Sequence, residues 1–114
     1  MRKLTDFEME ILSLIGTPNS EELDTYLRTA KVEDVAKQDR SHVHLRFVSP
    51  KIKPVENGYT ILLDWHSNDL DGAPIELLAI GNDDGFPVEL EIRRLDMNLI
   101  KQIPPAANWK RLTV

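Results

Sequence analysis

The spacing of the hydrophobic residues changes once along this chain, from the period of a helix to the period of a strand. Up to residue 30 the apolar side chains recur every three or four positions, and from residue 42 onwards they alternate with polar ones. A helix and a strand that each bury one face require these two spacings. Helices followed by strands are typical of an α+β domain. We therefore predict an α+β fold in which two N-terminal helices pack on a mainly antiparallel, meander-type sheet of four to five strands.

The two helices have recognisable start and stop signals. Thr5 and Glu8 have the spacing of a capping box, and Gly16 can end the first helix in a left-handed conformation. A second, short helix is predicted to open at Asn19 or Ser20. The apolar stripes are Leu4, Phe7, Ile11, Leu14 and Ile15 in the first helix, and Leu23, Tyr26 and Leu27 in the second.

The later part of the chain contains several segments with strand periodicity. Apolar and polar residues alternate through 42–48, and Asn57-Gly58 is a strong turn signal before the next strand. We expect that next strand to place one set of apolar side chains on a single face, namely Tyr59, Ile61, Leu63 and Trp65. The predicted strands are 32–36, 42–48, 59–66, 75–80 and 86–95, with a short helical turn at 98–103 and a final strand or packed tail at 109–114.

Composition narrows the class of protein. The chain has 114 residues. It has no cysteine, and this absence excludes disulfides, thiolate catalysis and cysteine-based zinc sites. The longest apolar run is 77–80, so we expect no membrane span. The first residues turn acidic before any apolar stretch, so we expect no secretory signal. We predict one domain over residues 1–114, located in the cytoplasm of a bacterium.

The net charge of −5 is concentrated in one segment. Between residues 64 and 92 the chain has eight carboxylates and no lysine or arginine. Direct binding to nucleic acid needs basic side chains opposite the phosphates, so we do not expect it. A basic protein partner or a cation suits this segment better. The eight carboxylates are Asp64, Asp69, Asp71, Glu76, Asp83, Asp84, Glu89 and Glu91.

The three histidines suggest an alternative function, that of a small metal-dependent enzyme. His42 and His44 are two residues apart on a predicted strand and therefore share a face, as metal ligands can. A third ligand would come from His66 or a carboxylate, which would give a zinc or iron site in a small metal-dependent enzyme. Solvent-facing histidines on an amphipathic strand are the more common meaning of this pattern, so we predict neither metal nor cofactor.

Other catalytic patterns are weak. The segment 69–72 has the Asp-x-Asp-Gly spacing of part of a calcium loop, but Leu78 stands where the bidentate glutamate belongs. An ordinary turn explains it as well. The chain has no nucleophile elbow, no phosphate-binding loop and no dinucleotide-binding glycine motif. We therefore expect that the protein is not an enzyme.

Two segments resemble a known group of proteins. The stretch Asn82-Asp83-Asp84-Gly85-Phe86-Pro87-Val88-Glu89-Leu90-Glu91-Ile92-Arg93-Arg94-Leu95-Asp96, followed by Ile100 and Pro104, resembles a recurrent ending of small bacterial domains. The opening Leu4-Thr5-Asp6-Phe7-Glu8 is similar to the starts seen in that group. Such domains look like immunity proteins that accompany polymorphic or contact-dependent growth-inhibition toxins. The resemblance implies stoichiometric protein–protein binding and no catalytic residue.

The acidic segment and the resemblance together give a functional prediction. We expect an immunity protein that binds and neutralises a cognate, basic toxin domain. The expected activity of that toxin is that of a nuclease. Aromatic anchors surrounded by carboxylates favour such a basic partner. A mimic of nucleic acid would need more numerous and more evenly spaced acids. The predicted toxin-facing residues are Trp65, Asp69, Asp71, Asp83, Asp84, Phe86, Glu89 and Glu91.

Overall fold

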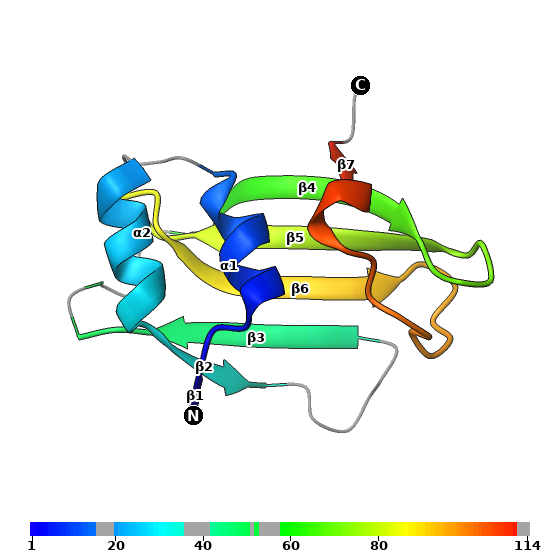
Figure 1. Ribbon diagram of the computed structural model, residues 1–114, viewed down its shortest axis with the longest axis horizontal. Coiled ribbons are helices and arrows are strands. Elements are labelled where there is room, and N and C mark those ends of the chain that lie inside the picture. The colour runs from blue at the N-terminus through cyan, green and yellow to red at the C-terminus, as the bar shows by residue number, and fades with distance from the viewer. Residues whose placement is uncertain (16–19, 36–41, 51, 53–57, 112–114) are drawn as a thin grey trace.

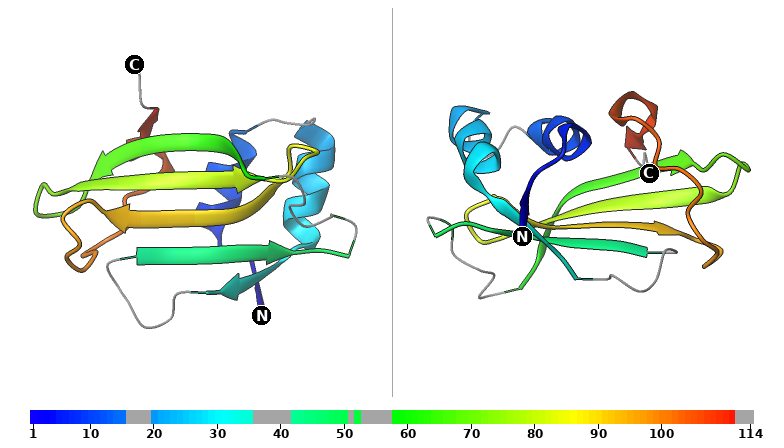
Figure 2. Two further views of the ribbon diagram at one scale, coloured as in Figure 1. Left: turned by 180° about the vertical axis from the view of Figure 1, so that it is seen from behind. Right: turned by 60° about the horizontal axis from the view of Figure 1, so that its bottom comes forward.

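Two layers form the fold, an antiparallel sheet and a set of helices on one of its faces. The computed structural model describes residues 1–15, 20–35, 42–50, 52 and 58–111. The helices of this described part are α1 (Asp6–Ser13), α2 (Ser20–Thr29) and the short 3-10 helix η1 (Ala106–Asn108). All three lie on the same side of the sheet (Figures 1 and 2). Within the same residues, none of the helices has the length and apolar character that crossing a membrane requires.

The sheet of the described residues has seven strands in the order β1-β2-β3-β6-β5-β4-β7, and every neighbouring pair is antiparallel. Strands β4, β5 and β6 follow one another as a meander, but β3 pairs with β6 rather than with β4. The chain therefore crosses two strands between β3 and β4. The bounds are β1 Arg2–Lys3, β2 Lys31–Asp34, β3 His42–Val48, β4 Thr60–Asn68, β5 Pro74–Gly81, β6 Pro87–Arg94 and β7 Lys110–Arg111.

The predicted α+β class is confirmed, and the predicted strand number is too low. The edge strands β1 and β7 have two residues each, which is too short for any alternation to appear in the sequence. The predicted meander-type order holds for β4, β5 and β6 but not for β3, which pairs with β6 from a distant part of the chain. Pairings of that kind leave no local signal.

The predicted capping box of the first helix is confirmed. The Thr5 hydroxyl accepts a hydrogen bond from the Glu8 amide at 3.2 Å, and the Thr5 amide donates to the Glu8 carboxylate at 2.8 Å. Arg2 on β1 donates two further bonds to that carboxylate, each of 2.8 Å. Burial opposes the charged form of Glu8, but the bonds from Arg2 and Thr5 outweigh it and lower its pKa. The predicted helix end at Gly16 and the helix start at Asn19 lie outside the described residues.

The helical turn predicted at 98–103 is wrong. The only 3-10 helix among the described residues comes later, at Ala106–Asn108, after Pro104 and Pro105. The amides of Lys101 and Gln102 instead donate to the buried carboxylate of Asp69, at 2.7 and 2.9 Å. A side-chain acceptor from another part of the chain thus replaces the carbonyls that a helix would use.

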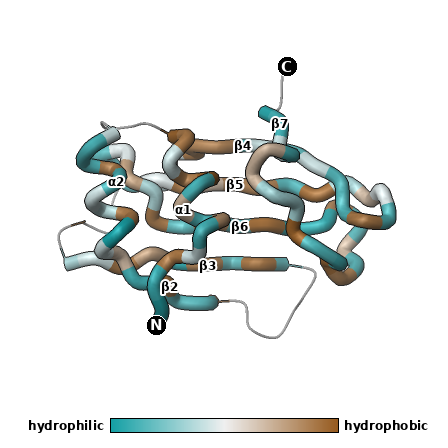
Figure 3. Tube along the Cα trace, in the orientation of Figure 1, coloured by the Kyte–Doolittle hydropathy of each residue, from teal (hydrophilic) through white to brown (hydrophobic). Residues whose placement is uncertain are grey.

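The core lies between the sheet and the helices. Inward-facing apolar residues of β3, β4, β5 and β6 pack against α1, α2 and η1, and Figure 3 shows hydrophobic and hydrophilic positions alternating along these strands. On β4 the predicted common face is wrong for the first two residues. Tyr59 and Ile61 are 66% and 52% exposed, whereas Leu63 is 7% exposed. The register of β4 against β5 shifts between Ile61 and Leu63, so the alternation changes face there.

Candidate functional site

The face of the sheet opposite the helices has two clusters of histidine and carboxylate side chains. Strands run along this face with no helix or strand of the described residues lying on it (Figure 2). Because side chains alternate along a strand, the residues between the core positions point to it. We call it the open face, and its residues on the four central strands include His42, His44, Arg46, Val48, Ile61, Asp64, His66, Glu76, Leu78, Ile80, Glu89, Glu91 and Arg93. All three histidines and four of the eight clustered carboxylates are therefore on one side of the molecule.

Strand register places these residues in two rows that cross the sheet. In one row the cross-strand partners are His44, Glu91, Leu78 and Asp64. In the next row they are His42, Arg93, Glu76 and His66. The first row has a histidine at one end and an aspartate at the other, and the second row has a histidine at each end.

Two histidines and one carboxylate form a first cluster between β3 and β6. The imidazole rings of His42 and His44 stack at 5.8 Å between centroids and 14° between planes. The Nε2 atoms of His42 and His44 lie 3.9 and 3.7 Å from Glu91 Oε1. His44 Nε2 is also hydrogen-bonded to Glu89 Oε1 at 2.7 Å. The side chain of Glu89 is 11% exposed, so this bond is well shielded from solvent.

A second cluster lies between β4 and β5. His66 Nε2 is 3.5 Å from Asp64 Oδ1, and Glu76 completes the group. The Glu76 carboxylate is also held by Arg93, whose Nε donates to it at 3.2 Å. Of the two predicted sources of a third ligand, His66 or a carboxylate, only a carboxylate lies beside His42 and His44. His66 is on β4, separated from β3 by β5 and β6.

Both clusters have the donor spacing of a metal site. In each group the ligand atoms lie within 4.8 Å of one another. Three polar atoms of these clusters are shut off from solvent and have no hydrogen-bond partner among the described residues: His42 Nε2, Asp64 Oδ1 and His66 Nε2. Buried polar atoms are normally paired, because an unpaired one costs free energy. The open face therefore has unused ligand capacity at both clusters.

The eight residues predicted to face a toxin do not form one surface. Glu89 and Glu91 are on the open face, and Trp65 points to the opposite, helix-covered side and packs against the core. Phe86 is half-buried and makes an edge-to-face contact with Tyr26, at 5.4 Å between ring centroids. The four loop aspartates occupy opposite ends of the sheet: Asp69 and Asp71 follow β4, whereas Asp83 and Asp84 follow β5.

Asp69 has a structural role that the sequence did not predict. Its carboxylate accepts hydrogen bonds from the amides of Lys101, Leu70 and Gln102 and lies 3.1 Å from the Arg94 guanidinium. Burial alone would raise the pKa of Asp69, but these four donors outweigh it and lower the pKa to about 2. Such a carboxylate is used within the fold and is not presented to a partner.

Sequence reasoning missed Arg94, which anchors this network. The Arg94 side chain is 4% exposed and also contacts Asp71 and Asp96, at 3.0 and 2.6 Å. Its hydrogen bonds to Asp96, above all, raise the pKa of Arg94 and hold the pKa of Asp96 below its usual range. One signal was present: Arg94 is in phase with the inward residues Leu90 and Ile92, so its side chain had to find buried partners.

Comparison with models of protein families, with curated proteins and with solved structures finds no match for this chain. Of the predicted site residues, only Glu89 and Glu91 lie with the histidines on the open face. That face is the candidate functional site.

Proposed function

We propose that the chain is a stoichiometric protein-binding domain whose open face contacts a basic toxin domain, and that it neutralises this cognate toxin as an immunity protein. The observation that carries the proposal is the one-sided covering of the sheet. Helices cover one face, while the other presents acids and histidines beside partly exposed apolar side chains. A face of this composition is typical of a surface that buries apolar anchors and pairs charges with a partner.

The apolar part of the open face adjoins its acidic part. Ile61 is 52% exposed and pairs across the strands with Ile80, and Val48 on β3 is 40% exposed. Together with Leu78 these residues supply apolar area that a partner can cover. Apolar contacts of this kind stabilise a complex, whereas the neighbouring charges set its specificity and association rate.

Charge supports a basic partner. The acids Asp64, Glu76, Glu89 and Glu91 are on this face, and the arginines there contact acids of their own: Arg93 contacts Glu76 at 3.1 Å and Arg46 contacts Glu33 at 4.0 Å. A toxin that cleaves nucleic acid needs a basic surface for its substrate. The same basic surface would be attracted to the open face. Because Arg93 already neutralises Glu76, the proposed contact residues are Asp64, Glu89 and Glu91, in place of the loop aspartates.

A charge-reversal titration tests the proposal. The partner is the toxin domain encoded beside this chain, and the dissociation constant is measured by calorimetry in a buffer containing a chelator. We expect Asp64→Lys with Glu91→Lys to weaken binding at least about tenfold and to reduce its dependence on salt, since paired interfacial charges contribute about 1.4 kcal/mol or more.

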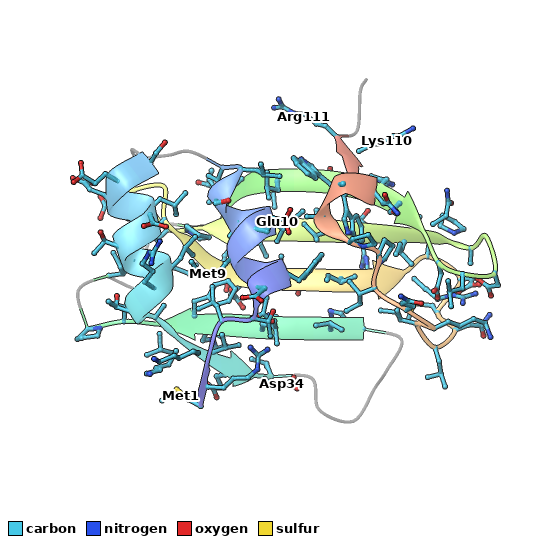
Figure 4. All side chains as sticks on the ribbon, viewed as in Figure 1. Met1, Met9, Glu10, Asp34, Lys110 and Arg111 are labelled. Atoms are coloured by element: carbon cyan, nitrogen blue, oxygen red, sulfur yellow. The ribbon has the colours of Figure 1, made fainter. Side chains whose placement is uncertain are left out.

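A matched control variant distinguishes the effect of this surface on binding from the effect of net charge. Glu10→Lys with Glu21→Lys changes the net charge by the same amount on the helical side, where Figure 4 shows Glu10 on α1. This control should bind like the unchanged chain. Equal losses in both double variants would show that only overall charge matters. A chain that neither binds the toxin domain nor protects cells from it would refute the proposed function.

A further inference from the structure

We propose that His42, His44 and Glu91 bind one divalent transition-metal cation of the Zn²⁺ class, with Glu89 as a fourth ligand. The site goes beyond protein binding and does not depend on it. It joins two strands that are distant in the chain, because His42 and His44 are on β3 and the two glutamates are on β6. The antiparallel pairing of these strands brings the four side chains to one place on the open face.

The distances suit a cation placed between the side chains. Both histidine Nε2 atoms face the same oxygen, Glu91 Oε1, at 3.9 and 3.7 Å. Ligand atoms that share a zinc ion lie about 2.0–2.2 Å from it, and therefore a little over 3 Å from one another. Small side-chain rotations close that difference. The stacked imidazole rings, 14° from parallel, already point their Nε2 atoms in a common direction.

The donor types select the metal. Two imidazole nitrogens with carboxylate oxygens suit zinc, copper, nickel or iron. Calcium and magnesium prefer sites made of oxygen alone. The second cluster offers a single imidazole, and its Glu76 is hydrogen-bonded to Arg93, so a positive charge already neutralises it. We therefore assign the cation to the first cluster.

A second, independent observation points to the same place. His42 Nε2 is shut off from solvent and has no hydrogen-bond partner among the described residues. The His42 side chain as a whole is 34% exposed, but its Nε2 lies on the buried side, 3.9 Å from Glu91 Oε1. A bound cation would satisfy this nitrogen. The cation would also take the place of the hydrogen bond from His44 Nε2 to Glu89, now 2.7 Å long, releasing its proton to solvent and leaving a Glu89 oxygen free as a further ligand.

Zinc titration of the untagged full chain tests the site. The chain is treated with a chelator, dialysed and titrated with ZnCl₂ by calorimetry, with CaCl₂ and MgCl₂ as comparisons. We expect one Zn²⁺ per chain and no measurable binding of Ca²⁺ or Mg²⁺. Replacing an outer partner of a metal ligand typically costs about 10- to 100-fold in affinity. Loss of a direct ligand in His42→Gln should therefore weaken zinc binding by more than about 100-fold.

The matched control is His66→Gln, which removes the imidazole of the second cluster. We expect it to bind zinc like the unchanged chain. His42→Gln should fold normally, because the replaced nitrogen makes no hydrogen bond, and circular dichroism of the metal-free protein checks this. Zinc affinity that is unchanged in His42→Gln, or reduced equally in His66→Gln, would overturn the assignment. So would an absence of zinc binding in the unchanged chain.

Discussion

Asp69 connects two parts of the chain through one carboxylate. It follows β4, and its oxygens accept hydrogen bonds from the amides of Lys101 and Gln102, about thirty residues later. Arg94, at the end of β6, contacts the same group. Because the residue is 5% exposed, each of these bonds is shielded from competing water. Arg94 also donates to the carbonyl of Leu99 at 3.2 Å, so Asp69 and Arg94 together hold the segment before η1 to the sheet.

The lowered pKa of Asp69 predicts an acid-sensitive stability. The folded value of about 2 lies below the ordinary value of 3.8, so the unfolded chain takes up the proton first as the pH falls. The stabilisation is fully present above about pH 4 and is lost as the pH falls towards 2. Thermal unfolding measured between pH 6 and pH 2 should show this decline. Asp69→Asn should be less stable at pH 6, with a flatter pH profile.

Asp84→Asn provides the control for that experiment. Asp84 is exposed in the turn after β5, at the other end of the sheet, so its loss should leave the shape of the pH profile unchanged. Parallel curves for Asp69→Asn and the unchanged chain would contradict the proposed role of the buried carboxylate.

The irregularity of β4 depends on a glycine in its neighbour β5. A Cβ atom added to Gly81 would lie 2.7 Å from Leu62 Cδ1. The register of β4 shifts at this point, between Ile61 and Leu63, so Leu62 occupies the space that a side chain at position 81 would need. The bulge and the glycine therefore belong together as one structural feature.

This contact predicts a coupled pair of substitutions. Gly81→Ala should destabilise the fold by about 1–3 kcal/mol, because it overpacks the contact with Leu62. Leu62→Ala removes packing and should also destabilise. The double variant should lose less than the sum of the two, since the smaller side chain makes room for the new methyl group. Urea unfolding of the four proteins measures the coupling, and simple additivity would count against the contact.

The elements show what the sequence could and could not predict. Regular alternation gave β3 with its observed bounds, and the capping box gave the start of α1. Alternation failed at β4, because the bulge exchanges the two faces after Ile61. The turn expected at 98–103 failed for a different reason: its amides bind a carboxylate that is distant in the chain.

Half of the candidate site could be predicted from the sequence. The strand period alone places His42 and His44 on one face, as the structure shows. Their carboxylate partners are on β6. The pairing of β3 with β6 places His44 opposite Glu91, although the two residues are distant in the chain. No local pattern specifies that register. The sequence therefore leaves His66 and a carboxylate open as the third ligand, and the structure separates His66 from the other histidines by two strands.

At the scale of the whole molecule, the two faces of the sheet differ in composition. The face covered by helices contains the apolar core, and the open face contains the histidines and half of the clustered acids. The two edges differ as well: Figure 4 shows Lys110 and Arg111 on β7 at one edge and Asp34 on β2 near the other. The proposed contact surface for a basic partner therefore lies away from the basic edge at β7.

The two proposals share that surface, so they predict a linkage between metal and partner. A bound divalent cation adds two positive charges next to Glu91 and should weaken the attraction of a basic toxin domain. Thermodynamic linkage requires that the toxin weaken zinc binding by the same factor, for which about 5- to 150-fold is typical of coupled sites. Toxin affinity measured with saturating ZnCl₂ and with chelator should differ accordingly. In His42→Gln the difference should vanish while binding without metal persists, and equal affinities in the unchanged chain would show that the cation and the toxin occupy separate surfaces.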